Sequence, residues 1–476
     1  MHTDQSYHCP RLLIAAPMSG SGKTTLMAGL IKALASKGLR VAPCKVGPDY
    51  IDPTYHSLAA ERPCHNLDAW MLPPDLIPTV LAQHTRDADV TLIEGVMGLF
   101  DGYGGRDDSG SSAHIARITD TPVLIVLDVR SQARTAAALV HGLRDFDRSI
   151  HVAGVILNRV GSPKHARMVT EAIEGHVGIP VLGALGREET LHLPERHLGL
   201  IPTAEPGRWR TWLQQAADLV TAHIDLEQLL ALAASASPLL ADAMPVLSAR
   251  TRDDRTVIAV ARDPAFSFLY EDNLTLLRQA GATIAFFSPM HDQALPPNTR
   301  ALYLCGGFPE LYAEVLSHNQ TMRTAIRQAA AVGMPVYAEC GGLMYLTEAI
   351  TDQHEQTHAM VGVIPGQSVM SGRLTLGYRT IEAVSDNWLW QTGEIMRGHE
   401  FHYSTWHTAA TPLSAYTILP DEWRPEPRRE GIQTSNVIAS YIHLHFLAYP
   451  ELAMRFVAAA AAWQPRPYHL DEATGA

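Results

Sequence analysis

A short glycine-rich stretch near the start of the chain contains residue types that bind phosphate. Residues 19–25 read SGSGKTT, so a lysine and two threonines follow closely spaced glycines. Glycines let successive backbone N–H groups converge on phosphate oxygens, the lysine reaches the outer phosphates, and a threonine hydroxyl can bind Mg²⁺. The usual pattern has a glycine where this chain has Pro17, but the converging N–H groups come mainly from later residues. We therefore expect this loop to bind ATP. Its residues are Ser19, Gly20, Ser21, Gly22, Lys23, Thr24 and Thr25.

The flanking sequence favours this interpretation over a plain glycine turn with a surface lysine. Residues 11–17 (RLLIAAP) form an apolar run of strand length, and residues 26–38 place apolar side chains at helical spacing. A strand, a glycine loop and a helix in this order are the context that a phosphate loop requires. Asn158 follows another apolar run, at a place where related nucleotide-binding folds offer an asparagine to adenine, so we add it to the expected ATP site.

Carboxylates follow two further apolar runs of the first half. Glu94 ends the run DVTLIEG, where it can complete a magnesium site with Thr24, and Asp101 lies one loop further on. Residues 45–52 form a polar cluster after another strand. Its members are Lys45, Asp49, Tyr50 and Asp52. The cluster is too polar for a core and too rich in Asp and Pro for a helix, so it is a loop with Asx turns or a ligand-bearing edge of the nucleotide site, and we favour the second.

Two apolar runs in the second half end in Cys-Gly-Gly, at Cys305 and at Cys340. A nucleophile on a sharp turn from strand to helix needs small residues two positions away on each side. Cys340 has Ala338 and Gly342 there, whereas Cys305 has Tyr303 on one side. We expect Cys340 to be the nucleophile, and the alternative is that both are buried structural cysteines. A helix that begins just after Cys340 should lower the pKa of its thiol.

Glycines and histidines supply the other groups that such a thiol needs. The peptide N–H groups of Gly306 or Gly307 and of Gly341 are the expected oxyanion donors. The thiol also needs a base, and the strand NVIASYIHLHF offers His443 and His445 on one face.

The elements that position these residues form two alternating series of strands and helices, which is typical of α/β domains with parallel sheets. In the first half, strands are expected at residues 11–17, 39–46, 89–96, 121–129, 151–160 and 179–185. A second series begins with TVIAVAR and includes both Cys-Gly-Gly runs, and residues 361–406 read as strands and hairpins. An Ala/Ser/Pro-rich passage separates the two series. We expect domains at residues 1–235 and 255–476, joined by a linker at 236–254.

The composition is that of a globular enzyme with small-molecule partners. The 476 residues, of which 46% are hydrophobic and 18% charged, are enough for two or three domains. Because 37 Lys+Arg and 49 Asp+Glu give a charge of −12 without like-charge blocks, we expect no nucleic acid and no membrane as a partner. Five scattered cysteines and an N-terminus without a long apolar core predict a cytoplasmic protein.

Ten short motifs give the chain a resemblance to the cobyrinic acid a,c-diamide synthase family, including its hydrogenobyrinic acid variant. They are SGSGKTT, KVGPDYIDPTYH, NLDAW, IEGVMGLFDG, LPERHLGL, CGGFPE, ECGGLMYL, LGYR, RGHEFHYS and SYIHLHF, in this order over nearly the whole chain. The resemblance implies an N-terminal phosphate-loop synthetase domain similar to dethiobiotin synthetase and a C-terminal class I glutamine amidotransferase domain. It implies ATP, L-glutamine and cobyrinic acid or a related tetrapyrrole as substrates, with amidation of the a and c acetate side chains of the ring.

The resemblance also assigns roles to residues. It places Asp49, Tyr50, Asp52 and Asp101 around the corrinoid and the metal, and it makes His443 the family histidine. Many class I amidotransferases have a glutamate two residues after this histidine, where this chain has His445, so the resemblance implies a dyad of Cys340 and His443. The expected Mg²⁺ ligands are Thr24, Asp52 and Glu94, and the expected substrate-binding residues are Lys45, Asp49, Tyr50 and Asp101.

The residues fit this chemistry. A carboxylate is a poor acyl donor because its leaving group would be oxide, and transfer of a phosphoryl group converts it into an acyl phosphate that ammonia can attack. Nickel-sirohydrochlorin diamide synthase would share nearly every motif. Cobyric acid synthase should differ in the KVGPDYIDP loop, and a partitioning-type ATPase would leave ECGGLMYL and SYIHLHF unexplained. The oligomeric state is left open by the sequence.

Overall fold

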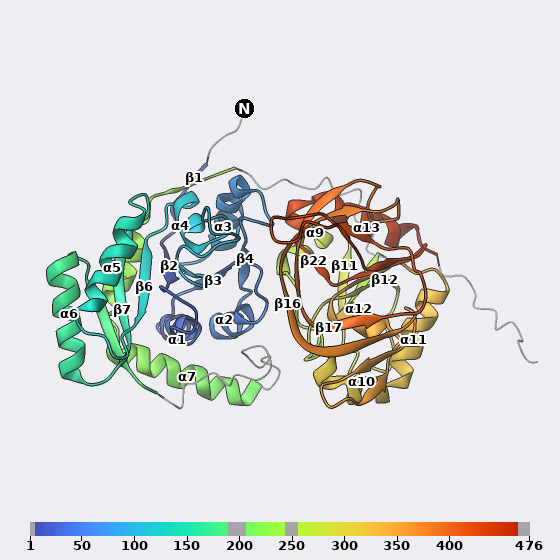
Figure 1. Cartoon of the computed structure of the whole chain (residues 1–476), viewed down its shortest axis with the longest axis horizontal. Coiled ribbons are helices and arrows are strands. Elements are labelled where there is room, and N and C mark those ends of the chain that lie inside the picture. Colours follow the sequence, from blue (N-terminus) through green and yellow to red (C-terminus); the bar gives the residue numbers. More distant parts are fainter. Residues whose placement is uncertain (1–4, 189–205, 243–255, 465–476) are drawn as a thin grey trace, which may run out of the picture. The chain divides into compact units, whose positions relative to one another are not determined.

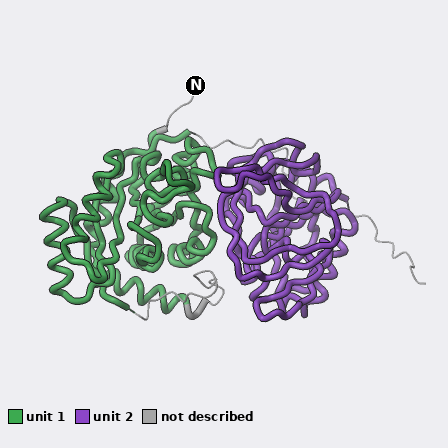
Figure 2. Tube along the Cα trace, viewed as in Figure 1, with its two compact units in different colours: residues 1–245 green, residues 246–476 purple. Residues whose placement is uncertain are grey.

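The computed structural model describes residues 5–188, 206–242 and 256–464, and the chain divides into two compact units. The first unit is Met1–Pro245 and the second is Val246–Ala476 (Figure 2). The division falls inside the expected linker, residues 236–254. Residues 239–241 of that range form a strand of the first unit, whereas residues 243–254 lie outside the described residues.

The core of the first unit is a seven-stranded sheet in which all neighbouring strands are parallel (Figure 1). In spatial order the strands are β4 (His65–Leu67), β3 (Val41–Val46), β5 (Val90–Glu94), β2 (Arg11–Ala15), β6 (Val123–Asp128), β7 (Val152–Val160) and β8 (Val181–Gly186). Strands β2, β3 and β5 are buried along their whole length, as expected where helices cover a parallel sheet. A separate antiparallel pair joins β1 (Gln5–Tyr7) to β9 (Leu239–Ala241).

Helices of the first unit connect these strands. They are α1 (Lys23–Ser36), α2 (Asp52–Ala60), the short 3-10 turn η1 (Pro74–Leu76), α3 (Ile77–Thr85), α4 (Ser112–Ile118), α5 (Thr135–Phe146), α6 (Pro163–Val177), α7 (Pro206–His223) and α8 (Leu226–Ala234). Helix α1 packs against α2 and α7. Gly29 permits the approach of α7, because a Cβ at this position would lie 2.8 Å from the carbonyl oxygen of Ala216.

Most strand predictions for the first half are confirmed, and one local prediction is wrong. The six predicted strands are β2, β3, β5, β6, β7 and β8, whereas the three residues of β4 are too few for a pattern. Asp52 was expected on a loop outside any helix or core, but it is buried and begins α2. Pro53 lies in the first turn of α2, where a missing N–H costs no helical hydrogen bond. Lys45 and Tyr50 of the same cluster are also buried.

The second unit contains a six-stranded sheet that carries both Cys-Gly-Gly sequences. In spatial order its strands are β11 (Thr283–Phe287), β10 (Val257–Ala261), β12 (Thr299–Leu304), β13 (Val336–Glu339), β21 (Val437–Ser440) and β20 (Ile432–Gln433). All neighbours are parallel except β20 and β21, which are antiparallel. Cys305 follows β12 and Cys340 follows β13, as predicted. The structure adds that these two strands are adjacent and parallel.

A second, mainly antiparallel sheet completes this unit. Its path is β15 (Thr357–Ala359), β14 (Ala349–Thr351), β16 (Gln367–Ala383), β17 (Ile395–His407) and β22 (Ile442–Leu444), and β18 (Tyr416–Ile418) links β16 to β19 (Arg428–Glu430). The long β16 and β17 pair confirms the strands expected within residues 361–406. Only Tyr441 separates β21 from β22, so the chain passes directly from one sheet to the other.

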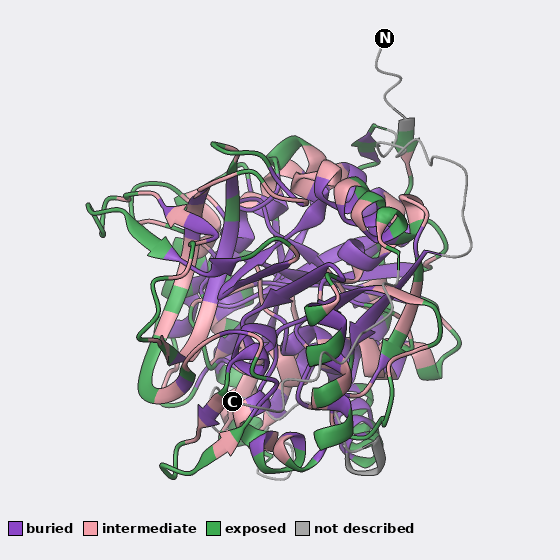
Figure 3. Ribbon diagram, turned by 90° about the vertical axis from the view of Figure 1, so that its right-hand side faces the viewer, coloured by how far each residue is buried: buried purple, intermediate pink, exposed green. Residues whose placement is uncertain are grey.

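The helices of the second unit are α9 (Glu271–Gln279), η3 (Pro309–Tyr312), α10 (Ala313–His318), α11 (Gln320–Ala331), α12 (Gly341–Leu346), η4 (Phe446–Ala448) and α13 (Pro450–Ala462). Figure 3 shows the central strands as buried and the connecting loops largely as exposed. Residues at the ends of the strands therefore lie between a buried scaffold and the exposed loops. In the described part of the chain, each helix is too short or too polar to cross a membrane.

Candidate active sites

The glycine-rich loop of the first unit has the backbone that phosphate binding requires. It runs from the end of β2 into α1, and Gly20 and Gly22 have φ angles of +74° and +90°. These angles belong to the left-handed region, which glycine enters without steric cost. A Cβ at Gly22 would also collide with the side chain of Asn158. The backbone conformation therefore favours glycine at both positions.

Two residues at the end of β7 hold the carbonyl groups of this loop. Asn158 Nδ2 donates to the carbonyl oxygen of Ser21 at 2.8 Å, and Arg159 Nη1 donates to that of Gly20 at 2.8 Å. Arg159 is itself held by Asp128 Oδ2 at 2.6 Å. These bonds fix the loop before any nucleotide arrives. Ser19 and Gly20 are exposed at its tip, which suits a loop that must contact a ligand.

Lys23 is buried behind the loop. Its ammonium group donates to the carbonyl oxygen of Met97 at 2.7 Å, and it lies 3.5 Å from that of Met18. Burial lowers the pKa of Lys23, and the nearby charge of Glu94 opposes this effect. Phosphate oxygens would offer the ammonium group stronger, charged acceptors than these carbonyls.

Thr24 and Glu94 form an all-oxygen pair beside the loop. Thr24 Oγ1 donates to Glu94 Oε1 at 2.8 Å, and the other carboxylate oxygen of Glu94 bonds to His56 Nε2. Hydroxyl and carboxylate oxygens are the donors that Mg²⁺ prefers, so the pair fits this ion. Sequence reasoning missed His56. Its signal is the spacing from Asp52, because residues four apart share one face of a helix, and α2 contains both.

Lys45 lies among three carboxylates near the same pair. Its ammonium group donates to Asp52 Oδ2 at 2.6 Å and lies 3.5 Å from Glu94 Oε1 and 3.9 Å from Asp49 Oδ2. Burial alone would lower the pKa of Lys45, but Asp52, Glu94 and Asp49 outweigh it and raise this pKa. Burial would raise the pKa of Asp52, yet the charge of Lys45 brings it down to about 2. Burial, followed by the charge of Asp52, raises the pKa of Asp49 well above its usual range.

The remaining predicted substrate residues differ in exposure. Tyr50 is buried, whereas Asp101 is exposed and accepts a 3.0 Å hydrogen bond from the N–H of Gly98. Asn66, of the NLDAW motif, donates to the carbonyl oxygens of Gly47 and Asp49 at 2.8 Å each. The structure thus brings Lys45, Asp49 and Asp52 together with Glu94. It places Asp101 on the loop after β5 that also contains Met97.

A cavity of about 520 Å³ opens beside the phosphate loop. Gly22, Thr25 and Asn158 line it on the loop side. Leu26, Leu185, Ala216, Leu219 and Val220 supply apolar walls, and Arg130, Arg159, Arg187 and Glu188 supply charges. A mostly apolar pocket with a few polar groups suits a nucleotide base and sugar. Asn158, which was predicted to contact adenine, lines this cavity, and its amide nitrogen donates to the loop.

In the second unit, Cys340 occupies a sharp turn between β13 and α12. Its φ of +48° is rare for a residue with a side chain and marks a strained position of the kind found at functional sites. A Cβ at Gly342 would collide with the carbonyl oxygen of Leu304, which confirms the need for a small residue there. The backbone N–H of Cys340 donates to the carbonyl oxygen of Ser440 at 2.7 Å. Cys305 is not among the described residues with a positive φ, and its thiol donates to the carbonyl oxygen of Ala261.

The expected low pKa of the thiol is wrong for this structure. Burial, followed by the charge of Glu310, raises the pKa of Cys340, and the N–H of Gly341 opposes this only in part. The thiol donates to the carbonyl oxygen of Phe401 at 3.4 Å. The resting thiol is therefore neutral, and forming a thiolate requires transfer of its proton to a base.

The predicted oxyanion glycines lie against each other and against His443. A Cβ at Gly341 would lie 3.0 Å from the backbone nitrogen of Gly307. A Cβ at Gly306 would collide with the imidazole of His443. The two Cys-Gly-Gly turns and His443 therefore lie in one cluster, and His443 is fully buried.

Two buried carboxylates near this cluster escaped sequence reasoning. Glu339 precedes Cys340, and its Oε2 lies 3.9 Å from His443 Nδ1. Glu400 accepts from Arg379 Nε at 2.7 Å and from Arg428 Nη2 at 2.8 Å. The signal for Glu339 is a charged residue inside the buried strand VYAE. Glu400 precedes Phe401, whose carbonyl oxygen accepts the hydrogen bond of the Cys340 thiol. The ion pairs of Glu400 tie β17 to Arg379 of β16 and Arg428 of β19.

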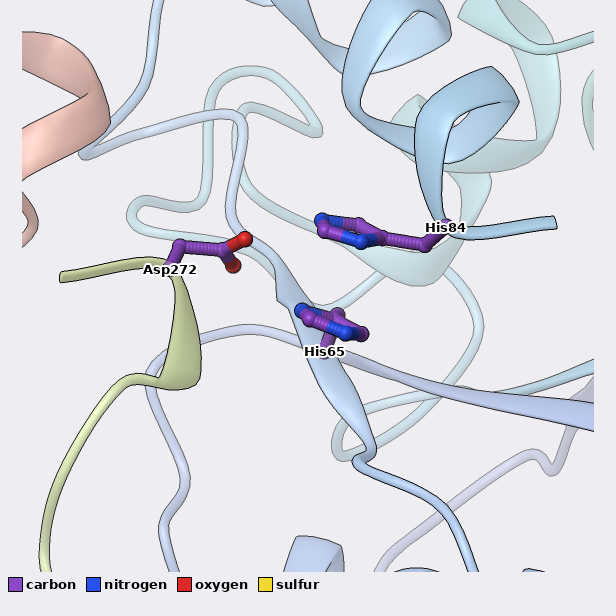
Figure 4. A group of neighbouring side chains, drawn as sticks. All are labelled: His65, His84 and Asp272. Carbon is purple, nitrogen blue, oxygen red and sulfur yellow. The ribbon is translucent and has the colours of Figure 1, made fainter. Parts of the chain in front are cut away.

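His65 on β4 and His84 on α3 form a stacked pair elsewhere in the first unit (Figure 4). Their ring centroids are 3.3 Å apart and the rings are nearly parallel, at 10°. Asp272, which Figure 4 also labels, belongs to the second unit, where its Oδ2 lies 3.8 Å from His445 Nε2. The stacked pair is separate in sequence from the phosphate loop of its unit.

Comparison with known families defines the class of protein. Residues 12–201 match the family described as the CobQ/CobB/MinD/ParA nucleotide binding domain. Residues 257–451 match the CobB/CobQ-like glutamine amidotransferase domain. The first unit is thus a phosphate-loop nucleotide-binding domain and the second a glutamine amidotransferase domain, which confirms the predicted fold class. An enzyme with these two domains is a glutamine-dependent, amide-forming ligase.

Curated relatives then identify the family within this class. The cobyrinate a,c-diamide synthases of Dehalococcoides mccartyi (strain CBDB1) and Syntrophotalea carbinolica are 46% and 43% identical to the chain. The alignments cover 94% of this chain in both cases, and 97% and 98% of the relatives. The hydrogenobyrinate a,c-diamide synthase of Streptomyces coelicolor is 41% identical over 96% of this chain and 98% of its own. The chain belongs to the cobyrinate a,c-diamide synthase family, as its motifs predicted. The motif LPERHLGL, residues 193–200, lies outside the described residues.

Proposed function

We propose that this protein uses ATP and glutamine to amidate the a and c acetate side chains of cobyrinic acid or hydrogenobyrinic acid in cobalamin biosynthesis. The observation that carries the proposal is the similarity over 94–96% of the chain to relatives named for these two reactions. The phosphate loop with Lys23 and the elbow with Cys340 supply the two chemistries that such an amidation needs.

The first unit would activate the carboxylate. A carboxylate oxygen of the tetrapyrrole attacks the γ-phosphorus of ATP, the bond to ADP breaks, and an acyl phosphate forms. Lys23 and Lys45 offset the negative charge that gathers around the transferred group. Thr24 and Glu94, together with Asp52, would hold Mg²⁺, which when bound neutralises charge on the phosphates.

Ligands fit the first unit in two places. The cavity beside the loop would hold the nucleoside of ATP, with Asn158 and Thr25 on its wall. Lys45, Asp49, Tyr50 and Asp101 would face the tetrapyrrole or the metal. This assignment is supported for Asp101 by its exposure, whereas the buried Lys45 would act mainly through its charge.

The second unit would release ammonia from glutamine. His443 takes the proton of the Cys340 thiol, and the sulfur attacks the carboxamide carbon. N–H groups of Gly306 or Gly307 and of Gly341 would stabilise the oxyanion. The proton passes to the leaving nitrogen, ammonia departs, and water hydrolyses the thioester to glutamate. Ammonia then attacks the acyl phosphate and expels inorganic phosphate.

Mass spectrometry of the product tests the proposal and separates its closest alternatives. We would incubate the purified chain with ATP, Mg²⁺, glutamine and either cobyrinic acid, hydrogenobyrinic acid or nickel-sirohydrochlorin. Two successive replacements of hydroxyl by amino groups on one of the first two acids support the proposal. Amidation of nickel-sirohydrochlorin alone would indicate that the chain is a nickel-sirohydrochlorin diamide synthase. ATP hydrolysis without amide or glutamate formation would favour a nucleotide-switched ATPase.

The cysteines agree with the cytoplasmic location that we propose. All five are free and buried in the structure. Disulfides are typical of oxidising compartments, whereas free thiols persist where the surroundings are reducing.

A further inference from the structure

The position that normally supplies the third member of a Cys-His-Glu site is occupied differently here. His445 follows His443 by two residues, and its Nε2 lies 3.8 Å from Asp272 Oδ2. Its ring stacks on Tyr270, with 4.6 Å between the centroids. His445 cannot act as the carboxylate that orients a neighbouring imidazole, so that role falls to another residue or to none.

Glu339 has the features of an orienting carboxylate. It is 1% exposed and ends β13, immediately before Cys340. Its carboxylate accepts from Tyr337 Oη at 2.8 Å, Tyr303 Oη at 2.9 Å and the backbone N–H of Leu444 at 3.0 Å. Burial, followed by the charge of Glu339, raises the pKa of both tyrosines well above their usual range, so they remain donors.

These three donors direct the carboxylate toward His443. Leu444 follows His443 on β22, so the bond to its N–H ties Glu339 to the strand that carries the imidazole. Glu339 Oε2 then lies 3.9 Å from His443 Nδ1. This separation is longer than a hydrogen bond, but catalytic hydrogen bonds are often long without substrate and tighten in the reactive complex.

We propose that Glu339 positions His443 for proton transfer from Cys340, an inference that rests on the proposed function of the second unit. An acceptor at Nδ1 selects the imidazole tautomer whose Nε2 can take the thiol proton. The carboxylate also stabilises the imidazolium that results. The third member of the site thus comes from the residue before the nucleophile and not from the segment after the histidine. Glu339 is a positioning residue, because it acts through His443.

The substitution Glu339→Gln tests this role. Gln has nearly the same volume but lacks the charge, and we expect kcat for glutamine hydrolysis to fall at least on the order of 10²-fold, the lower end of what positioned acid–base groups contribute. KM for glutamine should stay within about twofold, because the tautomer of His443 affects proton transfer more than substrate binding. Amidation with ammonium chloride in place of glutamine should match the native chain. The assay uses the full chain with ATP, Mg²⁺ and cobyrinic acid.

A shorter carboxylate provides a second variant. Glu339→Asp keeps the charge but withdraws it from His443 by one methylene, so kcat should lie between those of the native chain and Glu339→Gln. If Glu339 had only a structural role, both variants would lose thermal stability, but their kcat values would not fall in the order native, Glu339→Asp, Glu339→Gln. If Glu339→Gln fails to fold, the kcat of Glu339→Asp decides, and a native value would overturn the inference.

Glu430→Gln is the matched control. Glu430 is also buried and also holds the segment between the two sheets, since it accepts from Ser440 Oγ at 2.6 Å and from the N–H of Tyr441 at 2.7 Å. We expect glutaminase activity close to native. Equal losses in both Gln variants would show general damage to the strand and would overturn the inference, as would a native kcat in Glu339→Gln. Absence of glutamate release by the native chain would instead refute the proposed function and, with it, this inference.

Discussion

The two candidate sites prepare their reactive groups in opposite ways. In the first unit, the buried ammonium group of Lys45 is paired with the carboxylates of Asp52 and Glu94 before ligands bind. In the second unit, Cys340 lies in a buried environment that raises the pKa of its thiol. The reactive groups of the first site are therefore charged before ligands bind, whereas the thiol of the second site is neutral.

The difference follows from what each reaction brings to its site. ATP carries several negative charges, so fixed cations are needed, and buried cations need carboxylate partners until the phosphates arrive. Glutamine's side chain is neutral, and the nucleophile needs charge only at the moment of attack. A neutral thiol with a histidine nearby supplies a thiolate on demand and resists unwanted reactions at rest. Separate defects in the two units should therefore have separable effects.

The largest expected effect is on the use of glutamine as the nitrogen source. Cys340→Ser should lower glutamine-dependent amidation by at least about 10³-fold, because the nucleophile is lost. Amidation with ammonium chloride should remain within about twofold of native, since the first unit is untouched. Both rates can be measured by chromatography of the tetrapyrrole product. Cys305→Ala is the matched control, with glutamine-dependent activity near native. Equal loss with both nitrogen sources would break the comparison.

Lys23→Ala should produce the reverse pattern. We expect amidation from either nitrogen source to fall roughly 10²-fold or more, because the charge on the transferred phosphoryl group is no longer offset. Hydrolysis of glutamine without ATP should persist. Lys32→Ala, on the same helix but paired with Glu61 at 3.5 Å, should leave amidation near native. Loss of glutamine hydrolysis in Lys23→Ala would mean that the units are not chemically separate.

Glu94→Gln should have a smaller effect that depends on the metal. Gln keeps the size of the side chain but removes the charge that suits Mg²⁺, so we expect amidation to fall roughly tenfold to 10²-fold. Binding of ATP should weaken in the presence of Mg²⁺ and change little in its absence. Titration calorimetry with and without Mg²⁺ measures both. Equal weakening under the two conditions would argue against Glu94 as a metal ligand.

The last expected effect is on stability and its pH dependence, with no change in the rate of amidation, and it sharpens the contrast between the units. Burial raises the pKa of Glu430 from 4.5 to about 7, so its stabilising contribution is full below pH 4.5 and is lost as the pH rises through about 7. Asp52 behaves oppositely, because Lys45 outweighs burial and lowers its pKa from 3.8 to about 2. Its contribution is present above pH 3.8 and is lost as the pH falls through about 2.

Urea unfolding of the native chain and of Glu430→Gln measures this contribution. The difference in their free energies of unfolding should change by up to about 3 kcal/mol between pH 4.5 and 7.5, in the direction that favours the native chain at low pH. A difference independent of pH would contradict the raised pKa of Glu430.

The sequence predicted those features whose signals are local. The strands of both series have continuous apolar runs, the phosphate loop has its glycines, and the elbow at Cys340 has small residues at fixed spacing. Three-residue strands such as β4 are too short to leave a pattern. Asp52 was misplaced because its polarity and Pro53 suggested a loop, whereas a proline is acceptable in the first turn of a helix. The pairing with Lys45 that allows its burial is a tertiary effect.

Site residues that act through distant partners were harder to predict. His56 and Glu339 each lie inside quoted motifs, yet their roles depend on Glu94 and His443, which are far away in sequence. The prediction of a low pKa for the Cys340 thiol was wrong because it considered the start of a helix but not the burial that raises this pKa. Burial of a single side chain depends on the whole domain and cannot be read from its neighbours in sequence.

Isotope tracing tests most directly whether the first unit activates the acid that the second unit's ammonia captures. We would incubate the chain with ATP, Mg²⁺, glutamine and cobyrinic acid labelled with ¹⁸O in its carboxyl groups. An acyl phosphate passes one carboxyl oxygen to phosphate for each amide formed, so mass spectrometry should find one ¹⁸O in each inorganic phosphate released by amidation. Amide formation with unlabelled phosphate would contradict the account.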